Sequence, residues 1–224
     1  MSGLHLRLDK VKPSNIWFNH LTNLKELCLE FKGCHPRQHN YFAFLTTSLE
    51  KLSIIGHDIE LNSLSYFSKL NFLEMGFINY IYIDNLTPFD CFKNLKTLRI
   101  EHSKLKFEYF SRFFYKMREE FEPIGFHFNL TNLEELDLNQ MTLGVYLSKP
   151  FDNNLRLYFE NLPKLMSLRL RLHSLEQINF DLFEKLLNLE NLEISFHEGT
   201  SHFRKIKSLL SNLKQIKNLK LNEK

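Results

Sequence analysis

LEELDL, residues 133–138, is the clearest copy of a six-residue frame, L-x-x-L-x-L, that decides how this chain folds. The frame occurs eight times, starting at Leu24, Leu49, Leu70, Leu95, Leu133, Leu165, Leu189 and Ile216. Neighbouring frames start 21 to 38 residues apart, about 27 on average, which indicates an irregular internal repeat. Because apolar residues alternate at the end of each frame, each copy predicts a β-strand with one buried face. We therefore expect the repeats to stack into one solenoid.

Most frames are preceded by another apolar residue three positions upstream: Leu21, Phe67, Phe92, Leu130, Leu162, Leu186 and Leu213. With this addition the pattern resembles that of the leucine-rich-repeat family, and the resemblance covers residues 4 to 224. It implies a single α/β domain over residues 1–224, a curved solenoid with a parallel sheet of about eight or nine strands on its concave face. Short helices or turns are expected on the convex face. LHLRLDKV, residues 4–11, looks like the strand of a degenerate first repeat at 4–20.

The chain departs from the family pattern three residues after the last leucine of each frame. The family normally has Asn there, or sometimes Cys, Ser or Thr, and this side chain bonds the backbone of a neighbouring loop. The corresponding residues are Lys32, His57, Ile78, Ser103, Met141, His173, His197 and Lys224, which excludes an asparagine ladder at this position. The histidines are expected to replace the missing amide, since a neutral imidazole offers one donor and one acceptor. The alternative is that they form a pH sensor.

Two of the segments between frames have the apolar periodicity of helices. The first is residues 107–121, which end before Pro123 and carry Phe107, Phe110, Phe114, Met117 and Phe121 at steps of three and four. The second starts at Thr200 or Ser201, which are suitable N-caps, and continues through Phe203, Ile206, Leu210 and Leu213. The shorter segments carry an apolar residue after the frame, as Ile59, Leu105, Leu143 or Leu175, and are expected to hold single turns.

The composition of the chain argues against several classes of function. The net charge of +3 is too small, and too evenly spread, for the basic stripe of a nucleic-acid-binding protein. Three unevenly spaced cysteines, Cys28, Cys34 and Cys91, argue against a disulfide framework and favour a reducing, cytoplasmic location. The N-terminus lacks a signal-peptide pattern and no apolar run approaches 18 residues, so no membrane contact is expected. With 22 Phe, 8 Tyr and only 7 Gly, aromatic rings are expected to fill much of the interior.

The resemblance implies that function lies on the exposed sheet surface, at the x positions of L-x-L. The central positions hold Cys28, Ser53, Glu74, Arg99, Asp137, Arg169, Glu193 and Lys220. From Glu74 onward the signs of charge alternate, and neighbouring strands lie about 4.8 Å apart, so these side chains are expected to pair laterally. The pattern is compatible with a solvated face of weak ion pairs or with a charge template for a partner.

The residues proposed to contact a partner are apolar or cationic and lie on or beside this surface: Phe31, Ile55, Phe72, Phe77, Arg99, Arg169, Arg171 and Phe196. Aromatic and arginine side chains dominate the binding energy of protein interfaces. The first four are expected to form an apolar patch in the N-terminal half. The alternative is that Phe31, Phe77 and Phe196, at strand ends, turn into loops.

Motifs for catalysis are missing from the sequence. CHPRQH, with Cys34, His35 and His39, is the one cluster of metal-binding residue types worth naming, but no second ligand pair follows at a zinc-site spacing. No phosphate-binding glycine loop, nucleophile elbow or redox C-x-x-C occurs. We therefore expect no enzymatic activity, no cofactor and no metal. The expected function is binding of a protein or peptide on the concave sheet face. Alternatives are a substrate-recognition, regulatory or inhibitory subunit of an enzyme complex such as a ubiquitin ligase or phosphatase, and end-to-end association is open.

Overall fold

The fold was analysed in a computed structural model of the full chain. It describes residues 2–9, 21–32, 42, 47–56, 58–83, 89–107, 125–127, 129–138, 142–144, 156–158, 161–172, 183, 185–196 and 213–223. Cys34, His35 and His39, the cluster of metal-binding residue types in the sequence, lie outside these residues.

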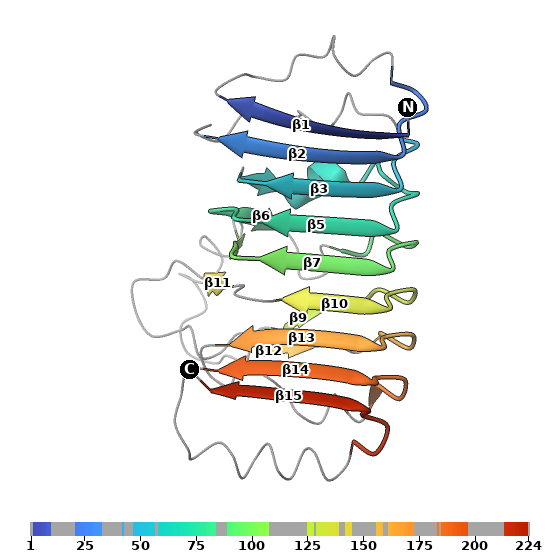
Figure 1. The fold of residues 1–224 in the computed structure, drawn as a ribbon, viewed down its shortest axis with the longest axis vertical. Coiled ribbons are helices and arrows are strands. Elements are labelled where there is room, and N and C mark those ends of the chain that lie inside the picture. Colours follow the sequence, from blue (N-terminus) through green and yellow to red (C-terminus); the bar gives the residue numbers. More distant parts are fainter. Residues whose placement is uncertain are drawn as a thin grey trace, which may run out of the picture.

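A nine-stranded, all-parallel sheet forms the body of the molecule (Figure 1). Its strands follow the chain from top to bottom of the figure and all point the same way. They are β1 (Gly3–Asp9), β2 (Glu26–Lys32), β3 (Lys51–Ile55), β5 (Phe72–Gly76), β7 (Thr97–Glu101), β10 (Glu135–Leu138), β13 (Ser167–Leu172), β14 (Asn191–Phe196) and β15 (Asn218–Glu223). Each of the eight frames therefore supplies one strand, and the degenerate first repeat supplies β1 at the edge, as the sequence predicts.

The core lies under one face of this sheet. The leucines of the frames align in register across neighbouring strands, so Leu73, Leu98 and Leu136 are direct neighbours. All three are fully buried, because the alternation of a strand turns every second side chain to the same side. Aromatic rings share this core, among them the fully buried Phe67, Phe89, Phe92 and Phe183. Burial weakens at both edge strands, since Leu4 and Leu6 of β1 are only partly buried and the frame residue Leu219 of β15 is 40% exposed.

The apolar residue three positions before each frame closes a tight turn. The backbone N–H of the first frame leucine donates to the carbonyl of this upstream residue, as in Leu70 to Phe67 (3.1 Å) and Leu133 to Leu130 (2.9 Å). The i to i+3 bond is that of a β-turn. The spacing of three in the sequence is therefore the span of a turn that leads into the strand. Both of its apolar residues are buried in five of the seven turns, whereas Leu21 and Ile216 are only partly buried.

Short parallel strands form a second, four-stranded sheet on the return side: β4 (Ile59–Glu60), β6 (Ile81–Ile83), β8 (Lys104–Phe107) and β11 (Thr142–Gly144). A two-stranded sheet of β9 (Gly125–His127) and β12 (Arg156–Tyr158) follows, and the 3-10 helix η2 spans Leu61–Leu64. The apolar residues after the frames are aligned here, Ile59 with Ile81, Leu105 and Leu143. The expectation of single turns is confirmed in the shortest of these segments, where η2 forms one 3-10 turn. Ile59, Leu105 and Leu143 themselves lie in short strands, because the backbones of adjacent repeats pair there.

Of the two predicted helices the structure describes only the ends. Phe107, the expected first residue of the helix at 107–121, is the last residue of β8, so a helix starting at this residue is wrong. Its backbone instead pairs with that of Ile83. Residues 108–121 lie outside the described part of the chain, as do residues 200–212 of the second predicted helix. Leu213 is buried and accepts the turn bond from Ile216 (3.3 Å).

A ladder of polar side chains links the turns at the amino ends of the strands. Three asparagines, each directly before the first leucine of a frame, donate their amide Nδ2 to a carbonyl of the preceding turn. Asn94 bonds Ser68 (2.8 Å), Asn132 bonds Lys93 (2.8 Å) and Asn188 bonds Pro163 (2.6 Å). Ser48 makes the same contact through Oγ to Thr22 (2.9 Å). The amide ladder that the sequence lacks at one end of the strands is present at the other.

Candidate functional site

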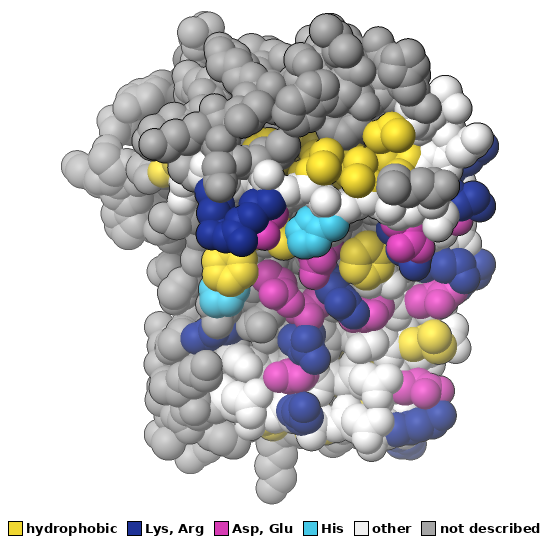
Figure 2. Space-filling model, turned by 45° about the horizontal axis from the view of Figure 1, so that its top comes forward, with side chains coloured by type: hydrophobic (Ala, Val, Ile, Leu, Met, Phe, Trp, Pro, Cys, Tyr) yellow, Lys and Arg dark blue, Asp and Glu magenta, His cyan; other side chains and the backbone are white. Residues whose placement is uncertain are grey.

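The solvent side of the nine-stranded sheet, here called the sheet face, carries one row of central residues in direct register. The row runs through His5, Cys28, Ser53, Glu74, Arg99, Asp137, Arg169, Glu193 and Lys220. This is the order that the frame predicts. In the space-filling view, blue and magenta side chains are interleaved down the face, and hydrophobic side chains gather toward its N-terminal end (Figure 2).

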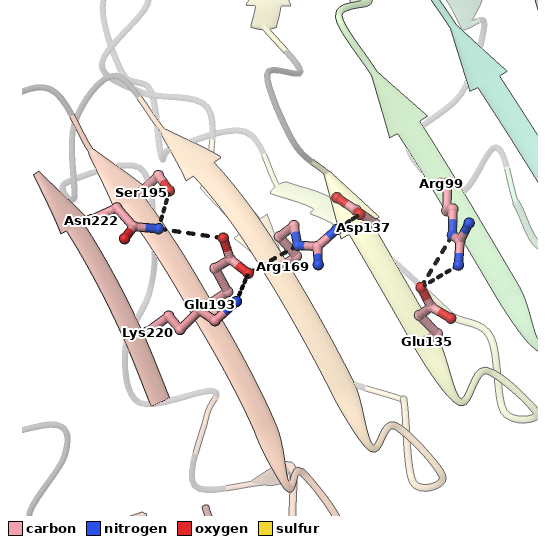
Figure 3. A network of polar contacts seen from close by, with 8 residues as sticks. All are labelled: Arg99, Glu135, Asp137, Arg169, Glu193, Ser195, Lys220 and Asn222. Carbon is pink, nitrogen blue, oxygen red and sulfur yellow. Dashed lines mark hydrogen bonds and ion pairs between the residues drawn. The ribbon is translucent and has the colours of Figure 1, made fainter. Parts of the chain in front are cut away.

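Lateral pairing occurs in the C-terminal half of this row (Figure 3). Arg169 stands between two carboxylates, with Nη1 at 2.6 Å from Asp137 Oδ2 and Nε at 3.2 Å from Glu193 Oε2. Lys220 Nζ approaches Glu193 from the next strand at 3.8 Å. The prediction that alternating charges pair across neighbouring strands is confirmed here, and the network holds its side chains in fixed orientations.

Arg169 is embedded in this network although its side chain is 46% exposed. Burial lowers the pKa of the guanidinium, but Asp137 and Glu193 outweigh this effect, so the pKa of Arg169 is raised. Asp137 itself has a side chain only 3% exposed. A carboxylate buried to this extent requires a cation and hydrogen bonds to remain ionised. The first role of Arg169 is therefore to neutralise a carboxylate within the sheet, ahead of any contact with a partner.

Arg99 does not follow the central row. Its Nε and Nη2 both donate to Glu135 Oε1, at 3.1 and 3.0 Å, and its Cζ lies 5.5 Å from the centroid of the Phe72 ring. Both partners stand two positions nearer the amino ends of their strands. Glu74, the neighbour of Arg99 in the row, accepts a hydrogen bond from Ser53 Oγ instead (2.6 Å). The predicted ion pair between Glu74 and Arg99 is thus replaced by these contacts of each residue with other partners.

More ion pairs line the amino ends of the strands, at positions that the central-row prediction did not consider. Lys25 pairs with Glu50 (2.8 Å), Lys96 with Glu134 (2.9 Å) and Lys217 with Glu190 (2.7 Å). The hydrogen bond and charge of Glu50 raise the pKa of Lys25, and those of Lys25 lower the pKa of Glu50. The signal was present in the sequence, because opposite charges occupy the second frame position in these neighbouring repeats. Exposed pairs of this kind contribute little to stability.

Phe31 is buried, so its placement on the exposed surface is wrong. Strand β2 continues to Lys32, and the alternation that buries Leu27 and Leu29 also turns Phe31 into the core, where it is 5% exposed. The alternative that it turns into a loop is wrong as well. The sequence could not show that β2 continues three residues beyond the frame, and this continuation turns Phe31 to the buried side.

The remaining candidates stand at different places. Ile55 and Phe72 are half-buried on the sheet face, and Arg171 is half-buried on the same face of β13 as Arg169. Phe77 follows β5 and is 61% exposed, in the loop that the alternative interpretation predicts. Phe196 is the last residue of β14. Its side chain lies outside the described part of the structure. No single patch unites all eight candidates, because Phe31 is buried and Arg99 and Arg169 are engaged within the sheet.

The carboxyl ends of β3, β5 and β7 share an unusual backbone. The residue after each strand has a positive φ: 81° at Gly56, 54° at Phe77 and 49° at His102. The N–H groups of Gly56 and Phe77 donate to the carbonyls of Gly76 and Glu101 in the next strand, both at 2.9 Å. The rings of Phe77 and His102 stack with centroids 4.6 Å apart and planes 9° apart. Left-handed conformations are unfavourable for bulky residues, so this aromatic pair is held in place at an energetic cost.

Comparison with solved structures shows what this arrangement is. A leucine-rich-repeat protein of Leptospira interrogans superposes with a TM-score of 0.52 at 17% sequence identity, over 100% of this chain and 61% of that protein. The chain has the leucine-rich-repeat fold. Internalin C2 of Listeria monocytogenes is also similar, with a TM-score of 0.41 and 17% identity over 81% of this chain and 74% of that protein. No protein-family model and no curated protein sequence matches the chain.

Within the leucine-rich-repeat fold, Ser103 fills the position where the family pattern has its ladder residue. It is 1% exposed, accepts a hydrogen bond from the backbone N–H of Ile78 (3.1 Å) and donates to the carbonyl of Glu101 (2.7 Å). The serine thus links two consecutive loops as the family asparagine is expected to do. The three histidines proposed to replace the amide, His57, His173 and His197, lie outside the described residues.

Reactive chemistry is sparse on this leucine-rich-repeat solenoid. In the described ranges no group of three or more His, Cys, Asp or Glu side chains could hold a metal ion. Cys28 and Cys91 are free thiols. Burial raises the pKa of the Cys91 thiol to about 11 and also raises the pKa of Cys28, so neither is an activated thiolate. Among the same residues no helix is long and apolar enough to span a membrane.

Proposed function

We propose that this solenoid is a recognition module that binds a partner protein or peptide on the sheet face. The proposal rests on a difference between side chains of that face. Some are paired with one another within the sheet, and others are accessible to a partner. Asp137, Arg169 and Glu193 hold one another across three strands. Ile55, Phe72 and Phe77 remain accessible in the N-terminal half.

A face fixed in this way suits binding. Side chains that are already ordered lose less conformational entropy when a partner docks, so more of the contact energy appears as affinity. Apolar and aromatic groups supply that contact energy, while the internal ion pairs suppress wrongly charged partners. Arg171, two residues after Arg169 on the same face, adds a cation that makes no ion pair with the described residues of the sheet.

The class of the partner determines the biological role of the solenoid. A catalytic partner would make the solenoid the substrate-recognition or regulatory subunit of an enzyme complex, and a non-catalytic partner would make it an adaptor. The free thiols Cys28 and Cys91 support a reducing compartment such as the cytoplasm as the place where it works.

Site-specific photo-cross-linking tests this proposal. A photoreactive amino acid is placed at Thr97 or Ser167, which are half-buried on the sheet face, or at Lys93, which is exposed in the turn before β7. In lysate of the source cell, the face positions are expected to give a discrete cross-linked protein that the turn position does not. A partner cross-linked from Lys93 but from neither face position would contradict the proposal.

A further inference from the structure

One part of the sheet face carries negative charge that the sheet does not neutralise. Glu74 and Glu101 are half-buried, and no Lys, Arg or His side chain of the described residues lies within 4 Å of either carboxylate. Arg99, the cation nearest to them in the register, directs its guanidinium to Glu135 and Phe72. These two carboxylates are therefore open to a cation from outside.

The two carboxylates flank a position without a side chain. Gly76 is the register partner of Glu101 and lies two residues after Glu74 on the same strand and the same face. Its φ is not in the left-handed region, so the backbone does not require glycine. Beyond its chain neighbours, a methyl group built on Gly76 would meet only Ile55 Cγ1, at 3.9 Å. Gly76 itself is buried, so a side chain of a partner would lie over Ile55 and Glu101 and not against the glycine.

An exposed aromatic residue follows this glycine directly in the chain. Phe77 is 61% exposed and stacks on His102 with one face of its ring. In Figure 2 hydrophobic, histidine and acidic side chains lie close together on the face, and a group of Lys and Arg side chains borders them toward its N-terminal end. A planar cation can lie on an open aromatic face while its N–H groups reach carboxylates at its edge.

The geometry points to an arginine side chain of the partner protein as the occupant of this corner, formed by Ile55, Glu74, Gly76, Phe77, Glu101 and His102. The guanidinium would stack on Phe77 and donate to Glu101 and Glu74, with its aliphatic stem over Ile55. Lysine fits less well, because its compact ammonium group neither stacks nor forms a bidentate hydrogen bond.

The cations on the other side of Ile55 do not oppose this assignment. Arg7 Nε lies 3.8 Å from Glu30 Oε1, so the charge of Arg7 faces a carboxylate of its own. Lys32 makes an interaction of its own as well. The strained backbone of Phe77 also fits a role in binding, because an exposed ring in an unfavourable conformation adds little to the stability of the fold.

This inference rests on the proposed function and is tested with peptides instead of the natural partner. Twelve-residue peptides are selected from a random display library on the wild-type chain, and the dissociation constant of each is measured with its arginines intact or replaced by citrulline. Selected peptides are expected to carry Arg beside an apolar residue. Citrulline should weaken binding by about tenfold or more, the loss for a charged hydrogen bond.

Matched variants of the protein locate the contact. Glu101→Gln and Phe77→Gly should each weaken the peptide by about tenfold, and citrulline should have little further effect in Glu101→Gln. Glu134→Gln, which removes a carboxylate paired with Lys96 at the amino ends of the strands, should leave binding unchanged.

Three results would overturn the inference: enrichment of acidic or arginine-free peptides, equal binding to wild type and Phe77→Gly, or no enrichment at all. Cross-linking of a natural partner from Thr97 or Ser167 would then still support the sheet face as a binding surface. A failure of the corner and a failure of the proposed function are thus distinguishable.

Discussion

Arg169 Nη1 lies 2.6 Å from Oδ2 of Asp137, whose side chain is only 3% exposed although it stands in the central row of the sheet face. Leucine-rich strands leave the x positions of the frame to solvent, and Asp137 is the member of that row most withdrawn from it. The contact means that Arg169, a candidate for partner binding, neutralises a buried charge of its own sheet. Loss of the Arg169 side chain would therefore lower the stability of the fold first, and would affect recognition of a partner only second.

Arg169→Ala should lower the free energy of unfolding by about 1–3 kcal/mol, because it leaves a buried carboxylate without its cation. Urea denaturation of both single variants and the Arg169→Ala, Asp137→Ala double variant gives the coupling energy, expected to be about 1 kcal/mol or more. Arg171→Ala, on the same strand and face, is the control and should stay within about 0.5 kcal/mol of wild type. Equal stability of the Arg169 and Arg171 variants would show that the pair has no structural role.

The two glycines at the carboxyl ends of β3 and β5 should respond oppositely to alanine. At Gly56, φ is 81° and a Cβ atom would lie 2.4 Å from the Phe31 carbonyl oxygen, so Gly56→Ala should destabilise by about 2 kcal/mol or more. Gly76→Ala meets no such contact and should be neutral or stabilising by about 0.5 kcal/mol. Thermal unfolding of both variants checks the difference. Similar melting temperatures for the two would contradict the backbone described here.

The frame leucines define the core, and their truncation should be costly. Leu98 and Leu136 are fully buried register neighbours, so Leu98→Ala and Leu136→Ala should each destabilise by about 2–5 kcal/mol through loss of contacts and an unfilled cavity. Chemical denaturation measures this, with Ser167→Ala on the sheet face as a comparison. Losses below about 0.5 kcal/mol would place these leucines on the wrong side of the sheet.

The strands and their register could be predicted because each frame carries its own local signal. A strand turns alternate side chains to opposite faces, so the sequence alone placed Leu98 inside and Arg99 outside. The short strands of the second sheet could not be predicted in this way. Ile59 and Leu105 lie in strands of only two and four residues, which are too short for their alternation to predict a strand, and these strands pair with those of adjacent repeats.

The sequence predicted which residues share the central row of the sheet face, but it did not predict all of the contacts that their side chains make. Alternating charges predicted the Asp137–Arg169–Glu193 pairs, where the nearest opposite charge is the lateral neighbour. Arg99 differs because its long side chain reaches Glu135 and the Phe72 ring in another row. The asparagines before the frames, such as Asn132, recur at one position of the repeat, so the sequence does carry a signal for the ladder at the amino ends of the strands.

The two described thiols should differ from ordinary cysteines in their reaction with iodoacetamide. Since burial raises the pKa of Cys91 to about 11, this thiol should stay largely protonated and unreactive at pH 8. The alkylation rate should rise with pH toward 11. The measurement is mass spectrometry of a Cys34→Ser variant over a pH series. Rapid modification of Cys91 at pH 8 in the folded protein would contradict the burial of this turn.

Binding through the sheet face is the central claim, and titration calorimetry with the cross-linked partner, once purified, tests it most directly. The Thr97→Arg, Ser167→Arg double variant places two bulky cations on the face, and Lys93→Glu changes a turn beside it. We predict that the double variant loses measurable affinity while its melting temperature stays near that of wild type, and that Lys93→Glu binds normally. Unchanged affinity of the double variant, with affinity lost in Lys93→Glu, would contradict the account.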